Sequence, residues 1–240
     1  MIYVVGLGPG GRDQITERAL EALEACDVIV GYKAYIALIR PFYKGRARLV
    51  ESAMKQERAR CEEVLALAEA GNTVGLVSSG DPGIYGMAGI MLEVAAGRAE
   101  VRIIPGITAA ASAGAILGAP LTHDFAVVSL SDLLTPWELI EKRLTAAAQA
   151  DFVICLYNPA SHGRPEHLAR AAEILMRVLP AERIAGWVRN AGREGELSQI
   201  TTLGALPKAP IDMFCTVIIG NSRTKLVAGH MVTPRGSRAD

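Results

Sequence analysis

The sequence lacks several features that mark particular classes of protein. Neither sign of charge is in excess, since 25 basic and 25 acidic side chains balance among 240 residues. General electrostatic attraction to nucleic acid or to an anionic membrane is therefore not expected. No apolar run approaches membrane length, and the chain opens directly on the strand-like run 2–5. These absences predict a cytoplasmic protein without a membrane segment.

Cysteine pairing is also absent. The four cysteines are isolated in the sequence, and none has a partner at Cys-x-x-Cys spacing or a histidine at metal-ligand spacing. Most of them lie in apolar patterns typical of buried helices or strands. We therefore expect no bound metal and interpret the following residues as reduced and structural: Cys26, Cys61, Cys155 and Cys215.

A complete dinucleotide signature is missing as well. Gly6, Gly8 and Gly11 have the G-x-G-x-x-G spacing after a first strand. Such a site also needs an acidic residue at the end of the second strand to bind the ribose, and the run 27–33 ends without one. Pro9 removes an amide donor from the loop. The sequence does not favour a nicotinamide or flavin site.

The first half of the chain alternates between short apolar runs and helical patterns. This alternation predicts parallel βαβ units. We expect strands at 2–6, 27–31, 48–50, 73–78 and 101–104, with helices at 16–25, 54–70, 84–96 and 108–117. The sequence Gly118-Ala119-Pro120 ends the last of these helices, so we place a domain boundary between residues 119 and 120.

The second half predicts a mixed sheet, because no helix of usable length separates its last two strands. We expect strands at 124–130, 151–157, 183–189, 196–203 and 213–219, with helices at 136–149 and 165–179. The segment 221–240 has poor periodicity and ends in polar residues, so we expect no regular element there and a frayed end. The fold class is thus α/β, in two domains, 1–119 and 120–240.

The stretch Val77–Met87 has the composition of a ligand loop. It runs from a buried-strand pattern into Ser79-Gly80-Asp81-Pro82, so it leaves the carboxyl end of a strand, where open α/β sheets bind small ligands. Gly80 and Gly83 leave the backbone accessible. The alternative is a tight turn in which Asp81 caps the following helix. The residues themselves favour neither interpretation.

Three loops together resemble the tetrapyrrole methyltransferase family: Gly6-Leu7-Gly8-Pro9-Gly10, Ser79-Gly80-Asp81-Pro82 and Pro105-Gly106-Ile107-Thr108-Ala109. The resemblance implies a homodimer of two-domain subunits with a parallel sheet in the N-terminal domain and a mixed sheet in the C-terminal domain. It also implies that S-adenosylmethionine binds in the cleft between the domains and that a small tetrapyrrole is the substrate.

Longer stretches are similar to the precorrin-3B C(17)-methyltransferases of cobalamin biosynthesis, which contract the corrin ring as they methylate it. They are 51–57, 129–137, 157–159, 189–194 and 216–222. The same reaction on a cobalt-bearing substrate stays open, because any cobalt would arrive inside the substrate. Methylation of RNA or protein, as some members of the family perform, also stays open, as do a dehydrogenase and a non-catalytic binding module. Net neutrality does not favour RNA.

The resemblance also implies a set of S-adenosylmethionine contacts. Backbone groups of the second and third loops would bind the polar groups of the cofactor, and Ile84 would offer an apolar wall. The implied contacts are Pro9, Ser79, Gly80, Asp81, Ile84, Thr108, Ala109, Asn158, Ala191 and Thr216.

Methyl transfer to an electron-rich ring carbon needs no covalent enzyme nucleophile, but ring contraction requires proton movement. The candidate acids and bases are Lys55, Tyr85, His123 and Asp132. His123 could equally cap the start of a strand, and Asp132 could cap the next helix. Substrate carboxylates require cations, which we expect among Lys55, Arg189 and Arg193.

Overall fold

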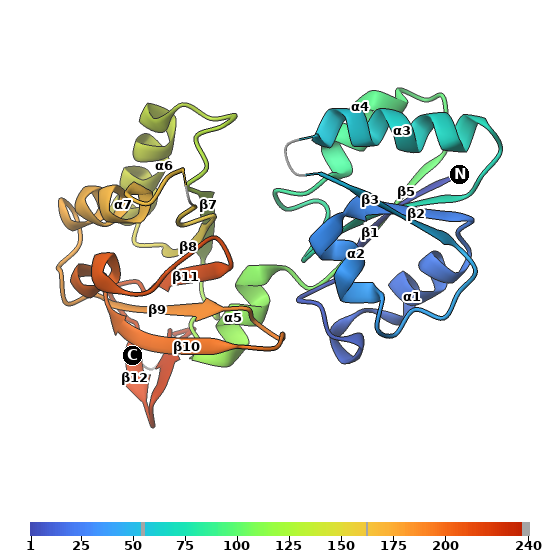
Figure 1. Cartoon of the computed structure of the whole chain (residues 1–240). Helices are drawn as coiled ribbons and strands as arrows, with labels where there is room; N and C mark the ends of the chain where they lie inside the picture. Colours follow the sequence, from blue (N-terminus) through green and yellow to red (C-terminus); the bar gives the residue numbers. More distant parts are fainter. Residues whose placement is uncertain (54–55, 162, 237–240) are drawn as a thin grey trace. The chain divides into compact units, whose positions relative to one another are not determined.

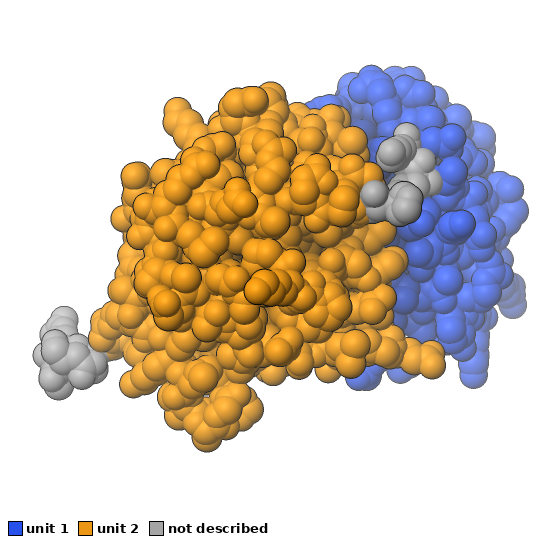
Figure 2. All heavy atoms as spheres, turned by 60° about the vertical axis from the view of Figure 1, so that its left-hand side comes forward, with its two compact units in different colours: residues 1–109 blue, residues 110–240 orange. Residues whose placement is uncertain are grey.

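The computed structural model of the chain describes residues 1–53, 56–161 and 163–236. By its internal contacts the chain divides into two compact units, Met1–Ala109 and Ala110–Asp240, which Figure 2 colours separately. Lys55, one of the candidate acids or bases, lies outside the described residues.

The first unit contains a parallel five-stranded sheet in the order β3-β2-β4-β1-β5 (Figure 1). Its strands are β1 (Ile2–Gly6), β2 (Val28–Tyr32), β3 (Arg48–Ser52), β4 (Val74–Ser78) and β5 (Val101–Ile104). Every pairing in this sheet is parallel, with Val5 opposite Val77 and Ile104 in the central register. The prediction of a parallel sheet is confirmed, and parallel strands bring all their carboxyl ends to one edge.

Helices cover both faces of this sheet (Figure 1). They are η1 (Arg12–Gln14), α1 (Glu17–Glu24), α2 (Lys33–Ile39), α3 (Glu57–Glu69) and α4 (Ala88–Ala95). Because side chains alternate along a strand, Val4 packs in the core with α3 and α4, whereas Val5 packs with α1 and α2. Thr16 caps α1 by accepting a hydrogen bond from the amide of Ala19 at 3.1 Å.

Two helices of the first unit differ from the expectation. Helix α2 is not expected from the sequence, because its seven residues are too few for a clear period and no side chain caps it. Helix α4 begins at Ala88 instead of 84, because the amide of Ala88 bonds to the Pro82 carbonyl at 2.9 Å and Tyr85 has a positive φ of 52°. The stretch 79–87 is therefore loop, with Ile84 and Tyr85 exposed.

The second unit contains a mixed sheet in the order β10-β9-β11-β8-β7, as predicted. Strands β7 and β8 are parallel, and β11 is antiparallel to both β8 and β9. Its elements are α5 (Ala109–Leu117), β6 (Gly118–Ala119), β7 (Phe125–Ser129), α6 (Trp137–Gln149), β8 (Val153–Tyr157), α7 (His167–Met176), β9 (Ile184–Arg189), β10 (Leu197–Thr202), η2 (Leu203–Lys208), β11 (Cys215–Ile219), β12 (Lys225–Val227) and β13 (His230–Val232).

Different helices cover the two faces of the second sheet. Helices α6 and α7 with η2 share one core cluster with Trp187, and α5 shares another with Val188, the next residue of β9. Leu117 of α5 lies against Gly186, where an added Cβ would come within 2.8 Å of the Leu117 side chain. Burying Leu117 contributes roughly 1.5–3 kcal/mol. The units therefore divide at 109/110, one helix before the boundary expected at 119/120.

The expectation of an irregular tail is wrong for residues 225–232. Strands β12 and β13 form a hairpin, and β13 pairs in parallel with β6 to complete a three-stranded sheet. Met231 is fully buried, and the amide of Thr233 bonds to the Ala119 carbonyl at 3.1 Å. The hairpin escaped prediction because its strands are three residues long, too short for a visible alternation.

Candidate functional site

The three glycine-rich loops of the first unit meet at the carboxyl edge of its sheet. Gly8 and Gly80 exchange backbone hydrogen bonds, with N–O distances of 3.1 Å from Gly8 and 2.8 Å from Gly80. The loop 105–108 leaves β5 beside them, since β5 pairs with β1. The loops after β1, β4 and β5 therefore form one backbone-built surface.

Asp81 ties two of these loops together. One carboxylate oxygen accepts a hydrogen bond from the amide of Gly83 at 2.8 Å, and the other accepts from the amide of Gly106 at 3.1 Å. Neither amide belongs to a helix, and α4 begins only at Ala88. Asp81 therefore stabilises a loop junction, which differs from the helix-capping alternative.

The approach between the loops is too close for any side chain at Gly106. A Cβ built there would lie 2.2 Å from the carbonyl oxygen of Gly80. The residues around this junction are only partly covered, because Ser79, Gly80 and Thr108 are half-buried and Ile84 is 38% exposed. The edge therefore presents backbone groups and an apolar side chain to solvent.

These features fit a small ligand with amine, carboxylate and ribose groups. Backbone amides and carbonyls at Ser79–Asp81 and Thr108–Ala109 lie at the exposed edge of the sheet, as such a ligand requires. The hydroxyl of Ser78, at the end of β4, is buried and has no hydrogen-bond partner among the described residues. The residues expected to bind the cofactor that belong to the first unit are thus brought together: Pro9, Ser79, Gly80, Asp81, Ile84, Thr108 and Ala109.

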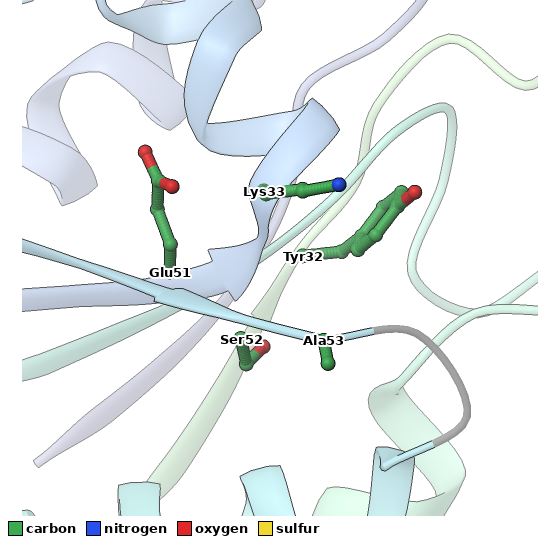
Figure 3. A pocket seen from close by; sticks show the side chains of 5 residues that line it. All are labelled: Tyr32, Lys33, Glu51, Ser52 and Ala53. Atoms are coloured by element: carbon green, nitrogen blue, oxygen red, sulfur yellow. The ribbon is translucent and has the colours of Figure 1, made fainter.

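The same edge carries a hollow at the ends of β2 and β3 (Figure 3). It has a volume of about 380 Å³ and is lined by Tyr32, Lys33, Glu51, Ser52 and Ala53. Figure 3 shows the side chains of Tyr32 and Lys33 extending in the same direction, to the right in this view, and that of Glu51 extending upward from its strand. The hollow therefore presents an ammonium group beside an aromatic ring.

The buried Arg60 supports the strand beneath this hollow. Its side chain donates hydrogen bonds to the Ser52 hydroxyl and, at 2.6 Å, to the Ala53 carbonyl. Arg60 is only 5% exposed and forms no ion pair with any carboxylate of the described residues. No sequence signal points to this role, because Arg60 lies in a charged helical pattern typical of surface.

The second unit also gathers expected site residues at one edge of its sheet. Strands β7, β8 and β9 run in the same direction, and β11 begins where they end. The residues that follow β7, β8 and β9 therefore lie at the same edge as the first residues of β11. These are Asp132, Asn158, Ala191 and Thr216.

Hydrogen bonds link the loops after β7 and β8. The Ser129 hydroxyl accepts from the side-chain amide of Asn158 at 2.9 Å and from the amide of Ser131 at 3.2 Å. Asn158 has a positive φ of 52°, which asparagine tolerates better than most residues. The hydroxyl of Tyr157 accepts a hydrogen bond from the amide of Ala110 at 2.7 Å, which holds the start of α5. The sequence analysis includes Tyr157 in a stretch similar to the C(17)-methyltransferases but gives it no role of its own, because it has the pattern of an ordinary strand residue.

His123 is placed away from this edge. It precedes β7, so it lies at the amino end of a strand whose carboxyl end leads to Asp132. Its Nδ1 accepts a hydrogen bond from the amide of Asp124 at 2.8 Å. This is the strand-capping alternative, and the structure does not bring His123 together with the other expected residues of its unit.

Asp132 is not a helix cap. Helix α6 has Pro136 at its N-cap position and no side-chain capping bond. The Asp132 carboxylate instead faces Arg164 at 3.7 Å and His167 at 3.6 Å, and its side chain is 37% exposed. Because its carboxylate is partly exposed and caps no helix, Asp132 remains a candidate for proton exchange.

Arg189, one of the cations expected to bind substrate carboxylates, already forms an ion pair with Asp212 at 2.9 Å.

The cysteines are unsuited to catalysis. All four are buried and free, and burial raises the pKa of the Cys155 thiol to about 12. A thiol with so high a pKa is protonated and a poor nucleophile at neutral pH. Among the described residues no group of three or more His, Cys, Asp or Glu side chains has a metal-binding arrangement. No helix in that part of the chain is both long and apolar enough to cross a bilayer.

Comparisons with known proteins agree with the resemblance. The family model described as tetrapyrrole (corrin/porphyrin) methylases matches residues 1–207. The "Probable cobalt-factor III C(17)-methyltransferase" of Salmonella typhimurium is 49% identical over 98% of this chain and 99% of that protein. The "Precorrin-3B C(17)-methyltransferase" of a Sinorhizobium species is 41% identical over 94% of this chain and 91% of that protein.

Solved structures show the same fold. A structure of the methyltransferase CobJ is 37% identical, with a TM-score of 0.91 over 97% of this chain and 99% of that one. A uroporphyrin-III C-methyl transferase from Thermus thermophilus, complexed with S-adenyl homocysteine, is 21% identical with a TM-score of 0.71 over 91% of this chain and 96% of that one. The expected two-part α/β fold is confirmed, and the chain is a methyltransferase that belongs to the tetrapyrrole (corrin/porphyrin) methylases.

Proposed function

We propose that this chain transfers a methyl group from S-adenosylmethionine to carbon 17 of a corrin-pathway tetrapyrrole, with contraction of the ring. The observation that carries this proposal is the 49% identity to a C(17)-methyltransferase across 99% of that relative's length. The backbone-built edge of the first unit supports it, because the groups there suit the polar parts of S-adenosylmethionine.

The cofactor would be held mainly by backbone groups. Ser79–Asp81 and Thr108–Ala109 supply donors and acceptors for its amine, carboxylate and ribose, while Ile84 supplies an apolar contact. On the second unit, Asn158, Ala191 and Thr216 are the proposed contacts, since they share one sheet edge. S-adenosylmethionine would supply an electrophilic methyl group.

The protein's part in the chemistry would be positioning and proton transfer. An electron-rich ring carbon attacks the methyl group directly, so the buried thiols are not needed. The proposed acid–base groups are Asp132, which is partly exposed at the second edge, and Tyr85, which is 56% exposed at the first. His123 is left out because it lies at the opposite end of β7.

The preferred substrate would be the cobalt-bearing tetrapyrrole. Identity to the Salmonella relative named for cobalt-factor III is 49%, against 41% to the Sinorhizobium relative named for precorrin-3B. Precorrin-3B is the second candidate, supported by the 41% identity to the Sinorhizobium relative that is named for it. A homodimer is part of the proposal and is tested by light scattering.

The test is turnover of cobalt-factor III and of precorrin-3B, each with S-adenosylmethionine, followed by mass and absorbance. A gain of one methyl group on either substrate supports the proposal, and the faster substrate identifies the branch. The control is the Asp81→Ala variant, in which the loop junction loses both of its carboxylate bonds and turnover should fall. Absence of methylation on both substrates by a protein that binds S-adenosylmethionine would refute the C(17) assignment.

A further inference from the structure

Ionisable side chains cluster on the covered side of Asp132 at the edge of the second sheet. Asp132 follows β7, Arg164 follows β8, and His167 is the first residue of α7. His167 is only 3% exposed, and the Arg164 side chain is 19% exposed. The cluster thus contains a partly exposed carboxylate, that of Asp132, beside the largely buried imidazole of His167 and guanidinium of Arg164.

The orientation of His167 is fixed by its neighbours. Its Nδ1 lies 2.9 Å from the carbonyl oxygen of Leu130, and a carbonyl oxygen only accepts, so Nδ1 carries a proton. The imidazole packs against the Trp137 ring with 4.7 Å between centroids, and the guanidinium of Arg170 covers that ring at 4.1 Å. His167 therefore cannot turn without breaking a buried hydrogen bond and a packed contact.

This orientation directs the other ring nitrogen at Asp132. Nε2 lies 3.6 Å from one oxygen of Asp132 and 3.9 Å from a carboxylate oxygen of Glu166. These distances exceed a hydrogen bond, as is common for catalytic groups before a ligand closes the site. His167 thus faces the carboxylate from the covered side, and with the proton on Nδ1 its Nε2 can accept a hydrogen bond from Asp132 once that carboxyl group has taken up a proton.

Arg164 faces the other oxygen of the same carboxylate. Its Nη1 is 3.7 Å from Asp132 Oδ1 and has no hydrogen-bond partner among the described residues. Its Nε donates to the Ser161 hydroxyl at 3.0 Å, which fixes the guanidinium. Asp132 is therefore faced on its covered side by two nitrogens, while 37% of its side chain stays open to solvent.

We infer that His167 is a positioning residue for Asp132, and that Asp132 takes a proton from the tetrapyrrole during the reaction. This inference rests on the proposed function. Addition of a methyl cation leaves the ring with one extra positive charge, and loss of one proton restores it. The ring–H bond breaks and its electron pair stays in the ring, while an O–H bond forms on the Asp132 carboxylate. Release of that proton to water regenerates the carboxylate.

Two substitutions separate positioning from a merely structural role. His167→Asn keeps a donor near Nδ1, for Leu130, and His167→Gln keeps a polar group near Nε2, for Asp132. We expect His167→Asn to lower kcat about 10- to 100-fold with an unchanged KM for S-adenosylmethionine, and His167→Gln to retain kcat within a few-fold. Glu173→Gln, an exposed change on α7, is the control. Retention of kcat in the Asn variant would overturn the inference.

A second measurement does not depend on turnover. The chain has four histidines, so ¹⁵N resonances of His167 can be assigned by their loss in His167→Gln. We expect Asp132→Asn to shift the Nε2 resonance of His167 and to leave Nδ1 nearly unchanged. An unchanged Nε2 resonance would overturn the link between the two residues. If the wild type methylates neither substrate, the proposed function fails, whereas this resonance still decides the positioning link.

Discussion

The edge of the first sheet is built from backbone, whereas the edge of the second is built from side chains. At the first, Gly8 and Gly80 bond to each other through main-chain groups, and the junction at Gly106 leaves no space for a Cβ. At the second, Asn158 bonds to Ser129 through side chains, and Asp132 faces Arg164 and His167. Backbone groups suit a constant ligand such as a cofactor, and side chains suit proton transfer and substrate choice.

The largest effect is expected from adding a methyl group to the backbone-built edge. In Gly106→Ala the new Cβ would lie 2.2 Å from the Gly80 carbonyl, so the loop must shift. A shift of about 1 Å should weaken S-adenosylmethionine binding and, by misplacing the methyl group, lower kcat roughly 100-fold. Overpacking of this kind should also cost about 1–3 kcal/mol of unfolding free energy. Calorimetric titration, turnover and urea unfolding measure the three effects.

The matched control for Gly106→Ala is Gly89→Ala. Gly89 lies in α4, and an added Cβ there meets no atom within 4 Å. Alanine should stabilise the helix by up to about 1 kcal/mol and leave binding unchanged. Equal affinity in the two variants would show that the first edge does not hold the cofactor.

A smaller effect is expected from removing the carboxylate that joins the backbone loops. Asp81→Ala leaves the amides of Gly83 and Gly106 without their acceptors. The cost should be about 1–3 kcal/mol in unfolding free energy, with a roughly tenfold loss of S-adenosylmethionine affinity. Asp81→Asn keeps one acceptor oxygen, so its unfolding free energy and its affinity for S-adenosylmethionine should lie between those of the wild type and Asp81→Ala. If Asp81→Ala has the same unfolding free energy and the same S-adenosylmethionine affinity as the wild type, this carboxylate does not hold the loop junction.

The sequence predicted the first edge better than the second for a physical reason. Gly80, Pro82 and Gly106 restrict or free the backbone locally, so their pattern carries the loop geometry by itself. His167 and Asp132 are 35 positions apart in the numbering, and only the pairing of β7 with β8 places them together. The local sequence pattern therefore indicated Asp132 as a candidate, but it could not indicate that Arg164 and His167 lie beside it.

The same reason explains the errors in the fold. The five strands of each sheet follow from short apolar runs, and the parallel and mixed characters of the two sheets were predicted. The hairpin of β12 and β13 depends on pairing with the two-residue strand β6, about a hundred positions earlier. His123 was a reasonable acid–base candidate by residue type, but strand direction places it at the far end of β7.

Loss of the hydrogen bond between Ala110 and Tyr157 at the second edge should have a modest effect. Tyr157→Phe removes the acceptor of the Ala110 amide, which lies 2.7 Å from the hydroxyl. The expected loss is about 1 kcal/mol in unfolding free energy, together with faster hydrogen exchange at the Ala110 amide. Tyr35→Phe is the control, because the Tyr35 hydroxyl makes no hydrogen bond within the described residues. Unchanged exchange at Ala110 would contradict the contact.

The smallest effect is expected from treating the native protein with a thiol reagent. Each unit contains two of the four buried cysteines. Burial raises the pKa of Cys26 and Cys155 to about 12, and that of Cys61 and Cys215 to about 11. At pH 8 the native protein should therefore resist a thiol reagent that modifies all four cysteines in denaturant. Mass spectrometry assigns each modification to the first unit or the second, so it shows which unit opens first in urea.

The same shifts set a pH dependence whose sign is fixed. An unfolded thiol ionises near its ordinary pKa of 9.0, whereas the native thiols stay protonated up to about 11 or 12. As pH rises above 9 the unfolded state binds fewer protons than the native state, so unfolding free energy should fall through this range. Cys155→Ala removes one thiol of the second unit and should flatten the fall, measured as urea midpoints at pH 8, 9 and 10. An equal slope in the variant and the wild type would contradict a raised pKa of the Cys155 thiol in the native state.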